Sequence, residues 1–340
     1  MEQGRCRLGL IGAGNVVETY HLPVLRSLRN VEMSWVCDRD LDRARSLART
    51  FGIPEIYKSV EECSDVEVVL VGIPVGARRS VLNIVTSRGW SALCEKPFAP
   101  TLADHKAIVE QARHYGVQLG IGLQRRQYST TQVARQLIEA KLLGKPQQII
   151  AGEGTCVRRT GRDSDWYQGS AQASGGTLYE TGSHLVDQVF TICGATNYRI
   201  ERCRQDGWNG LELETSVTGI VNLESSAEVP FAFVVSRMHD VYNGIVVRCQ
   251  NGEIRVALSP ERPIEICSYN NAVPITIAFP NPAVNNMSLA MAAEWTHFLD
   301  KRNKSQPFSD WDTGLLVSAF VEDCFRVAIK SHSLVAEVYR

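Results

Sequence analysis

The sequence predicts a two-domain α/β protein, and three observations support this fold class. The chain has 340 residues, which is too long for a single ordinary hydrophobic core. At roughly 150 residues per domain, this length predicts two domains. Up to about residue 122, short apolar runs alternate with amphipathic helical stretches, which predicts a doubly wound parallel sheet. Beyond that point the apolar runs are joined by short turns, which predicts a large, open, mainly antiparallel sheet. We therefore expect domains at residues 1–122 and 123–340.

The N-terminal domain is expected to contain six strands separated by helices. The strands are Arg7–Ile11, Glu32–Cys37, Glu55–Tyr57, Val66–Ile73, Ala92–Cys94 and Gln118–Gly122. The expected helices cover residues 15–29, 40–51, 76–88 and 101–115. A helix between successive strands is what a right-handed crossover in a parallel sheet requires.

The C-terminal domain is expected to combine hairpin-linked strands with a few helices. A bridging helix, Thr131–Leu143, leads to the strands Gln148–Val157, Leu213–Leu223, Glu228–Met238, Gly244–Cys249, Glu253–Ala257 and Ile264–Cys267. Two more helices are expected at 284–302 and 312–330. The stretch Val229–Val235 is apolar on both sides of its strand, so we expect the open sheet face to join copies of the chain into a homodimer or homotetramer.

Composition excludes several classes of partner. The net charge is -1 and the pI about 6.7, which gives no footprint for nucleic acid. The ten cysteines are scattered without a C-x-x-C pair and predict reduced thiols rather than disulfides or a metal site. No run of 18 apolar residues and no leader-like apolar region occur, so we expect no membrane partner and a cytoplasmic location.

The apolar run Leu8–Ile11 leads directly into Gly12-Ala13-Gly14-Asn15-Val16. A strand that ends in Gly-x-Gly at the start of a helix brings backbone N–H groups and a helix dipole to a pyrophosphate. The motif alone is weak, because Val17 occupies the third glycine position and many such turns bind nothing.

An acidic residue at the end of the second expected strand strengthens the dinucleotide hypothesis. Asp38 follows that strand near the spacing at which the fingerprint places an acid for the ribose hydroxyls. The alternative is that Asp38 only caps the next helix. A carboxylate here favours NAD over NADP because it repels a 2′-phosphate, although the adjacent Arg39 softens this exclusion.

The strand Ala92–Cys94 runs into Glu95-Lys96-Pro97. Ligands of open α/β sheets lie beyond the carboxyl ends of the strands, so Lys96 is expected to face the nicotinamide region. The alternative is an ordinary surface lysine, which is the usual place for this residue type.

A second polar cluster follows Gly175-Gly176. In a helix that begins there, Glu180, His184 and Asp187 share one face. A histidine flanked by carboxylates is suited to accept a proton. A solvated helix face is the alternative.

Several arginines are expected near the cleft, among them Arg126, Arg158, Arg159 and Arg162. Ordinary surface positions account for most arginines. The functional alternative is recognition of a carboxylate or phosphate on the substrate. Trp166 and Tyr167 offer a stacking surface for a sugar ring.

Together these motifs resemble the Gfo/Idh/MocA oxidoreductases. The resemblance rests on the glycine turn, Asp38-Arg39, the strand ending at Pro74, Glu95-Lys96-Pro97, and Gly175-Gly176 followed by Glu180, His184 and Asp187 in that order. It implies an N-terminal Rossmann domain, a C-terminal α/β domain with an open sheet, and a nicotinamide-dependent enzyme acting on sugars, inositols or similar polyols.

The resemblance also implies roles for individual residues. Lys96, Glu180 and His184 would form the proton relay; Glu180 departs from the usual Asp, and Arg78 replaces a usual His, which suggests a different substrate contact. The expected cofactor contacts are Gly12, Gly14, Asn15, Val16, Asp38, Arg39, Pro74, Glu95 and Lys96. The expected substrate contacts are Lys96, Arg126, Arg158, Trp166, Tyr167, His184 and Asp187.

The predicted activity is NAD(H)-linked interconversion of a secondary alcohol and a ketone on a sugar, cyclitol or related compound. His184 would act as base, with Lys96 polarising the oxygen and Glu180 orienting the pair. Three alternatives stay open: a lyase or glycosidase that retains its NAD, a nucleotide-sugar ketoreductase, and a non-enzymatic dinucleotide sensor.

Overall fold

The computed structural model describes residues 5–156, 176–208, 211–271, 273–279 and 287–331. The chain divides into two compact units. The N-terminal unit contains the chain up to Gln124 and the later segment Ser288–Leu315, and the C-terminal unit contains Arg125–Met287 and the chain from Leu316. The boundary that we expected at residue 122 leaves out this returning segment, whose local pattern does not distinguish it from the helices of the C-terminal unit.

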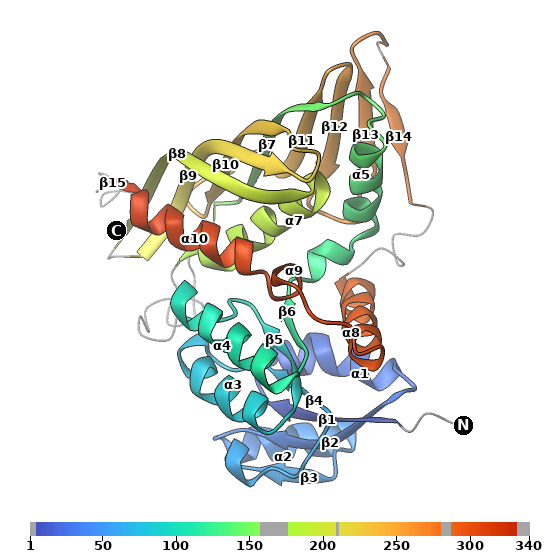
Figure 1. The fold of residues 1–340 in the computed structure, drawn as a ribbon, viewed down its shortest axis with the longest axis vertical. Helices are drawn as coiled ribbons and strands as arrows, with labels where there is room; N and C mark the ends of the chain where they lie inside the picture. Colours follow the sequence, from blue (N-terminus) through green and yellow to red (C-terminus); the bar gives the residue numbers. More distant parts are fainter. Residues whose placement is uncertain (1–4, 157–175, 209–210, 272, 280–286, 332–340) are drawn as a thin grey trace. The chain divides into compact units, whose positions relative to one another are not determined.

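The N-terminal unit is built on a six-stranded, fully parallel sheet in the order β3-β2-β1-β4-β5-β6. Its strands are β1 (Cys6–Ile11), β2 (Val31–Cys37), β3 (Glu55–Tyr57), β4 (Val68–Val71), β5 (Ser91–Glu95) and β6 (Leu119–Gly122). Its helices are α1 (Leu22–Ser27), α2 (Leu41–Phe51), α3 (Arg78–Ser87), α4 (Leu102–Tyr115), α8 (Met287–Asn303) and α9 (Asp310–Thr313), with a π-helical turn at Val17–His21 before α1 (Figure 1). This order confirms the predicted doubly wound fold.

The register of this sheet brings the predicted motifs to one edge. Ile11, Val71 and Cys94 lie in one row across β1, β4 and β5. The strands are parallel, so the chain leaves all three at the same side. The glycine turn, Pro74 and Lys96 therefore follow neighbouring strands at the carboxyl edge, where open α/β sheets bind ligands.

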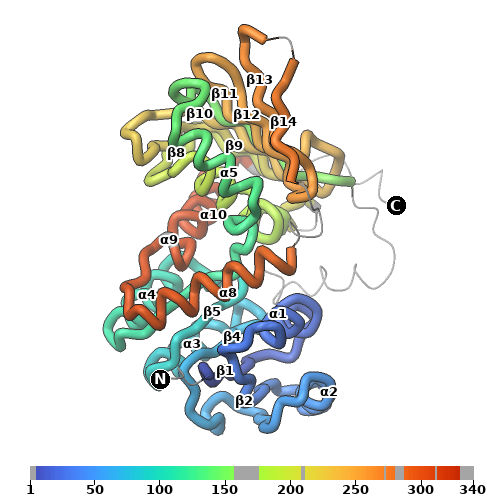
Figure 2. Tube along the Cα trace, turned by 90° about the vertical axis from the view of Figure 1, so that its right-hand side faces the viewer, coloured from blue at the N-terminus to red at the C-terminus, as the bar shows by residue number. Residues whose placement is uncertain are grey.

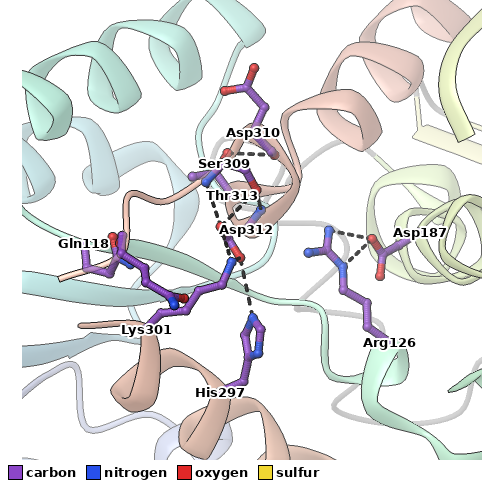
Figure 3. Close-up of polar contacts among 10 residues, drawn as sticks. Gln118, Arg126, Asp187, His297, Lys301, Ser309, Asp310, Asp312 and Thr313 are labelled. Atoms are coloured by element: carbon purple, nitrogen blue, oxygen red, sulfur yellow. Dashed lines mark hydrogen bonds and ion pairs between the residues drawn. The ribbon is translucent and has the colours of Figure 1, made fainter. Parts of the chain in front are cut away.

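The returning segment packs into the core of the N-terminal unit. Trp295 is fully buried and Phe298 is 5% exposed. A Cβ atom at Gly120 would lie only 2.9 Å from the Phe298 ring, so β6 and α8 approach closely. Figure 3 shows how α8 is tied to α9: Lys301 Nζ lies 2.7 Å from Oδ1 of Asp312, and the Ser309 N–H donates to Oδ2 at 2.7 Å.

We expect Asp312 to stabilise the fold in a pH-dependent way. Burial alone would raise the pKa of its carboxyl, but hydrogen bonds from His297, Lys301 and the Ser309 backbone outweigh burial and hold the pKa well below its ordinary value. A depressed folded-state pKa stabilises the protein above the unfolded value of about 3.9, and this contribution is lost as the pH falls further. Asp312→Asn should lower the free energy of unfolding by about 1.5–3 kcal/mol at neutral pH.

Urea unfolding of both proteins at neutral and acidic pH checks this prediction. The difference between parent and variant should shrink below about pH 4. Asp310→Asn is the matched control, since Asp310 lies on the same helix but makes an exposed ion pair with Arg113 that should contribute at most about 1 kcal/mol. An Asp312 effect no larger than that of Asp310 contradicts the prediction.

The C-terminal unit is built on a nine-stranded, mixed sheet in the order β14-β13-β12-β11-β7-β10-β9-β8-β15. Only the pairs β7–β10 and β8–β15 are parallel, so the predicted mainly antiparallel sheet is confirmed. The strands are β7 (Pro146–Gly154), β8 (Ala195–Trp208), β9 (Leu211–Leu223), β10 (Glu228–Ser236), β11 (Gly244–Cys249), β12 (Gly252–Ala257), β13 (Ile264–Ser268), β14 (Ile275–Ile277) and β15 (Ile329–Ser331). The helices are α5 (Ser129–Glu139), α7 (Ser183–Cys193) and α10 (Leu315–Val327), with a π-helical turn at Leu178–Gly182 before α7.

Helices cover one face of this sheet. The Phe320 ring of α10 contacts Phe231 and Phe233 of β10 and Phe190 of α7, while α5 packs on β12 (Figure 2). Alternate residues of β10 point the other way and are less buried: Pro230 is exposed, and Ala232 and Val234 are half-buried. In the described ranges, no helix is long and apolar enough to cross a bilayer.

Candidate active site

The turn after β1 has a conformation that glycine favours. Gly12 adopts a φ of 105°, and a Cβ atom there would collide with the backbone carbonyl of Gly72. Beside Gly14, by contrast, a Cβ atom would meet no atom within 4 Å. The structure therefore leaves open space against bare backbone, which is what a pyrophosphate needs at this turn.

Val17 stands where the fingerprint places a third glycine, and the structure shows how it is accommodated. Val17 is fully buried, and its Cγ2 occupies the position that a Cβ atom at Gly72 would take. Close packing of the helix on the sheet is the usual role of the third glycine. Here a glycine on the strand side, after β4, allows the same close approach.

Asp38 is part of the glycine turn as well as the end of β2. Its Oδ2 accepts the Ala13 N–H at 2.7 Å, and its Oδ1 accepts the Asp40 N–H at 2.8 Å. Each carboxylate oxygen has room for a further donor, so these contacts are compatible with binding a ribose hydroxyl. Asn15, Val16, Arg39 and Pro74 are exposed.

Lys96 follows β5 and is held by its neighbours. The Lys96 N–H donates to Glu95 Oε2 at 3.1 Å, and Glu95 Oε1 lies 2.8 Å from His21 Nε2. Burial would raise the pKa of Glu95, but the His21 hydrogen bond and nearby positive charges keep it below its ordinary value. The resemblance suggested a substrate contact for Arg78, but this guanidinium is buried and donates to the carbonyls of Ile73, Glu95 and Pro97.

The predicted helix after Gly176 is present, and none of the faces of α7 is exposed to solvent. All eleven residues of α7 are buried, so the alternative reading of His184 and Asp187 as solvated surface residues is wrong. Glu180 precedes α7 in the π-helical turn and its side chain is 15% exposed. Glu180 and His184 therefore lie on one continuous helical segment.

Two residues that the sequence analysis did not single out support this segment. Glu212 of β9 accepts the Leu178 N–H at 2.9 Å, and burial raises its pKa to about 7. Arg237 follows β10, donates to Thr181 Oγ1 at 2.9 Å, and lies 3.7 Å from Glu180 Oε2. Arg237 could have been suspected from the sequence, because it is a charged residue at the end of a strand. Glu212 could have been suspected only from its inward-facing position in the strand.

Arg126 and Asp187 form a buried ion pair. Arg126 Nε and Nη2 lie 2.7 and 2.6 Å from the same oxygen, Asp187 Oδ1 (Figure 3). Burial raises the pKa of Asp187, and the charge of Arg126 opposes that shift. Oδ2 of Asp187 is buried and has no hydrogen-bond partner among the described residues. The preceding residue, Arg125, makes a bidentate ion pair with Glu153.

The structure groups only part of the predicted site. Lys96 belongs to the N-terminal unit, and Glu180, His184 and the Arg126–Asp187 pair belong to the C-terminal unit. Arg158, Arg159, Arg162, Trp166 and Tyr167 lie outside the described residues.

The strand order, the glycine turn and the acid after β2 define the N-terminal unit as a dinucleotide-binding Rossmann domain. The chain belongs to the Gfo/Idh/MocA oxidoreductase family. Residues 6–123 match the family model for the NAD-binding Rossmann fold, and residues 131–255 match the family's C-terminal domain.

Curated relatives include trans-1,2-dihydrobenzene-1,2-diol dehydrogenases. The pig enzyme is 28% identical over 55% of this chain and 56% of its own length, and the rabbit enzyme is 32% identical over 47% and 48%. The matched part of the chain thus spans about half the length of these relatives.

Solved structures show the same fold at low identity. An aldose-aldose oxidoreductase from Caulobacter crescentus has a TM-score of 0.81 at 18% identity, covering 95% of this chain and 97% of that one. A 3-ketoreductase from Actinomadura kijaniata, solved with NADP, has a TM-score of 0.80 at 16% identity, covering 97% and 100%. An Agrobacterium radiobacter oxidoreductase, solved with NAD+, has a TM-score of 0.77 at 19% identity, covering 95% and 96%.

Proposed function

We propose that this protein is an NAD(H)-dependent oxidoreductase that interconverts a secondary alcohol and a ketone on a sugar, cyclitol or related compound. The observation that carries the proposal is the position of Lys96, at the carboxyl end of β5 in the row of strands that also carries the glycine turn. The names of the relatives, a diol dehydrogenase, a ketoreductase and an aldose oxidoreductase, agree with this substrate class.

In this proposal the protein's own groups handle the substrate proton and oxygen. A bound nicotinamide supplies the hydride acceptor or donor. His184 takes the hydroxyl proton when the alcohol is oxidised and returns it in the reverse direction. Lys96 donates a hydrogen bond to the reacting oxygen, and Glu180 orients these groups. His184 is 8% exposed on α7, and close packing limits the rotation of a side chain, which favours a general base.

A substrate screen tests the proposal directly. Cyclitols, neutral sugars, acidic sugars and nucleotide sugars are offered with NAD+ while reduced nicotinamide is followed by absorbance, and ketones are offered with NADH for the reverse direction. At least one polyol or sugar should give cofactor-dependent turnover. Single changes of Arg158, Arg159 and Arg162 to Met then report whether the substrate is anionic. If the proposal of an anionic substrate is correct, at least one change should raise KM roughly tenfold or more.

We expect NAD to be preferred over NADP. Asp38 accepts backbone hydrogen bonds within the glycine turn, and its charge would repel a 2′-phosphate. Asp38→Asn keeps an acceptor for the Ala13 N–H but removes the charge. Its ratio of kcat/KM for NAD to that for NADP should fall at least about tenfold, equivalent to 1.4 kcal/mol. Comparable efficiency of the parent with both cofactors would falsify the preference.

We also propose that the chain forms a homodimer or homotetramer through the outward face of its nine-stranded sheet. Pro230, Ala232 and Val234 on β10 give this face an apolar surface. Light scattering at micromolar concentration should show an oligomer, and Val234→Lys should weaken it. Leu142→Lys is the control, because Leu142 is exposed but lies outside the sheet. A monomeric parent contradicts the proposal.

A further inference from the structure

A chain of buried hydrogen bonds leads from α8 to the Glu95-Lys96-Pro97 turn. Trp295 Nε1 donates to His21 Nδ1 at 3.1 Å, and His21 Nε2 lies 2.8 Å from Glu95 Oε1. His21 and Trp295 are both fully buried. The three residues are far apart in sequence, and all belong to the N-terminal unit.

The Trp295 N–H determines the donor and the acceptor in each of these hydrogen bonds. An indole N–H only donates, so Nδ1 of His21 is the acceptor. The proton of a neutral imidazole must then be on Nε2, from which it is donated to Glu95. The other carboxylate oxygen of Glu95 accepts the Lys96 N–H at 3.1 Å. The tautomer of His21 thus fixes the carboxylate that holds the Lys96 backbone.

The surroundings leave this carboxylate little freedom to move. A Cβ atom at Gly122 would lie 3.0 Å from Glu95 Oε1, so β6 closes one side. Arg78 donates to the carbonyls of Glu95 and Pro97, on either side of Lys96. His21 is the last residue of the π-helical turn that follows the glycine turn. The π-helical turn that starts beside the predicted pyrophosphate site therefore ends at the residue that contacts Glu95.

We propose that His21 and Trp295 are positioning residues that fix the orientation of Lys96 through Glu95. The inference rests on the proposed role of Lys96 in the reaction. Neither residue needs to touch substrate: Trp295 selects the tautomer of His21, His21 holds the Glu95 carboxylate, and Glu95 holds the Lys96 N–H. Supporting groups of this kind place a reactive side chain, and misplacement by about 1 Å costs on the order of a hundredfold in rate.

The test compares variants that keep or remove the donor to Glu95. His21→Phe keeps an aromatic ring but removes both ring nitrogens, and kcat should fall roughly tenfold to a hundredfold. His21→Gln can present an amide N–H near the position of Nε2, so kcat should recover to within about fivefold of the parent. The Kd of NAD, measured by calorimetry, should change less than about threefold in both, because the glycine turn and Asp38 are untouched.

Trp295→Phe provides a second variant in case His21→Phe does not fold. It removes the indole N–H together with part of a buried ring, and kcat should fall about threefold to tenfold. Trp35→Phe is the matched control: Trp35 is also fully buried in the same unit, and its indole N–H donates to the Ser64 carbonyl at 2.9 Å. Trp35→Phe should lower the melting temperature without changing kcat at temperatures well below melting.

The outcomes separate this inference from the proposed function. If Lys96→Met abolishes turnover while His21→Phe and Trp295→Phe stay within about twofold of the parent, the positioning role is wrong. It is also wrong if Trp35→Phe lowers kcat as much as Trp295→Phe does, since the effect would then be general destabilisation. If Lys96→Met itself retains turnover, the proposed function fails instead.

Discussion

Replacing Lys96 by Met should lower kcat by roughly 10²- to 10⁴-fold, the range for removing a group that acts on the reacting oxygen or its proton. The side chain is half-buried at the carboxyl edge of the sheet. Met fills a similar volume without opening a cavity, so the melting temperature and the Kd of NAD should stay near those of the parent. Steady-state kinetics, thermal melting and calorimetric titration of NAD measure the three quantities.

Lys106→Met is the control for this change, because Lys106 is an exposed lysine on α4 of the same unit. It should leave kcat unchanged. Near-normal turnover of Lys96→Met would refute the catalytic assignment. A large drop in melting temperature would show instead that Lys96 supports the fold.

Removing Asp187 should have the largest effect on stability. Asp187→Ala removes the carboxylate that pairs with the Arg126 guanidinium, whose side chain is 9% exposed. A buried charge that loses its partner destabilises a protein by about 3–5 kcal/mol. Urea unfolding, followed by a probe of the C-terminal unit, should show this loss.

A double variant distinguishes a lost partner from a lost contact. Arg126→Met with Asp187→Leu removes both charges and should be more stable than Asp187→Ala, because no uncompensated buried charge is left. Glu139→Ala is the surface control: Glu139 pairs with Arg135 on α5 in an exposed ion pair that should contribute about 0.3–0.5 kcal/mol. An Asp187→Ala variant as stable as Glu139→Ala would refute the burial argument.

The N-terminal unit was largely predictable because its pattern is local. Buried parallel strands read as short apolar runs, and five of the six expected strands are longer or shorter than the observed ones by a few residues at most, while Glu55–Tyr57 coincides with β3. The first expected helix, 15–29, proved to contain the π-helical turn Val17–His21. No periodicity in the sequence predicts that turn.

The C-terminal unit was less predictable because much of its pattern is polar. The strand β8 (Ala195–Trp208) was missed, since charged residues such as Arg199, Glu201 and Arg204 take its outward positions and break the apolar signal. The single helix expected at 312–330 is divided in the structure between α9 and α10. Gly314, which has a φ of 68°, separates the two.

Those parts of the candidate site that belong to local sequence motifs could be predicted. The glycine turn, Asp38 and Lys96 each follow a strand, so the parallel topology determines where they lie. The pairs Arg126–Asp187 and His21–Glu95 join distant segments. These contacts depend on tertiary packing and could not be read from spacing.

The most direct test of the proposed function follows one hydrogen atom. The best substrate of the screen is labelled with deuterium at the carbon that bears the reacting hydroxyl, and the protein is supplied with NAD+. The label should appear at C4 of the nicotinamide in released NADH, in step with ketone formation and dependent on Lys96. Product formation with no label in free NADH would contradict it and favour an enzyme that retains its NAD, such as a lyase or glycosidase.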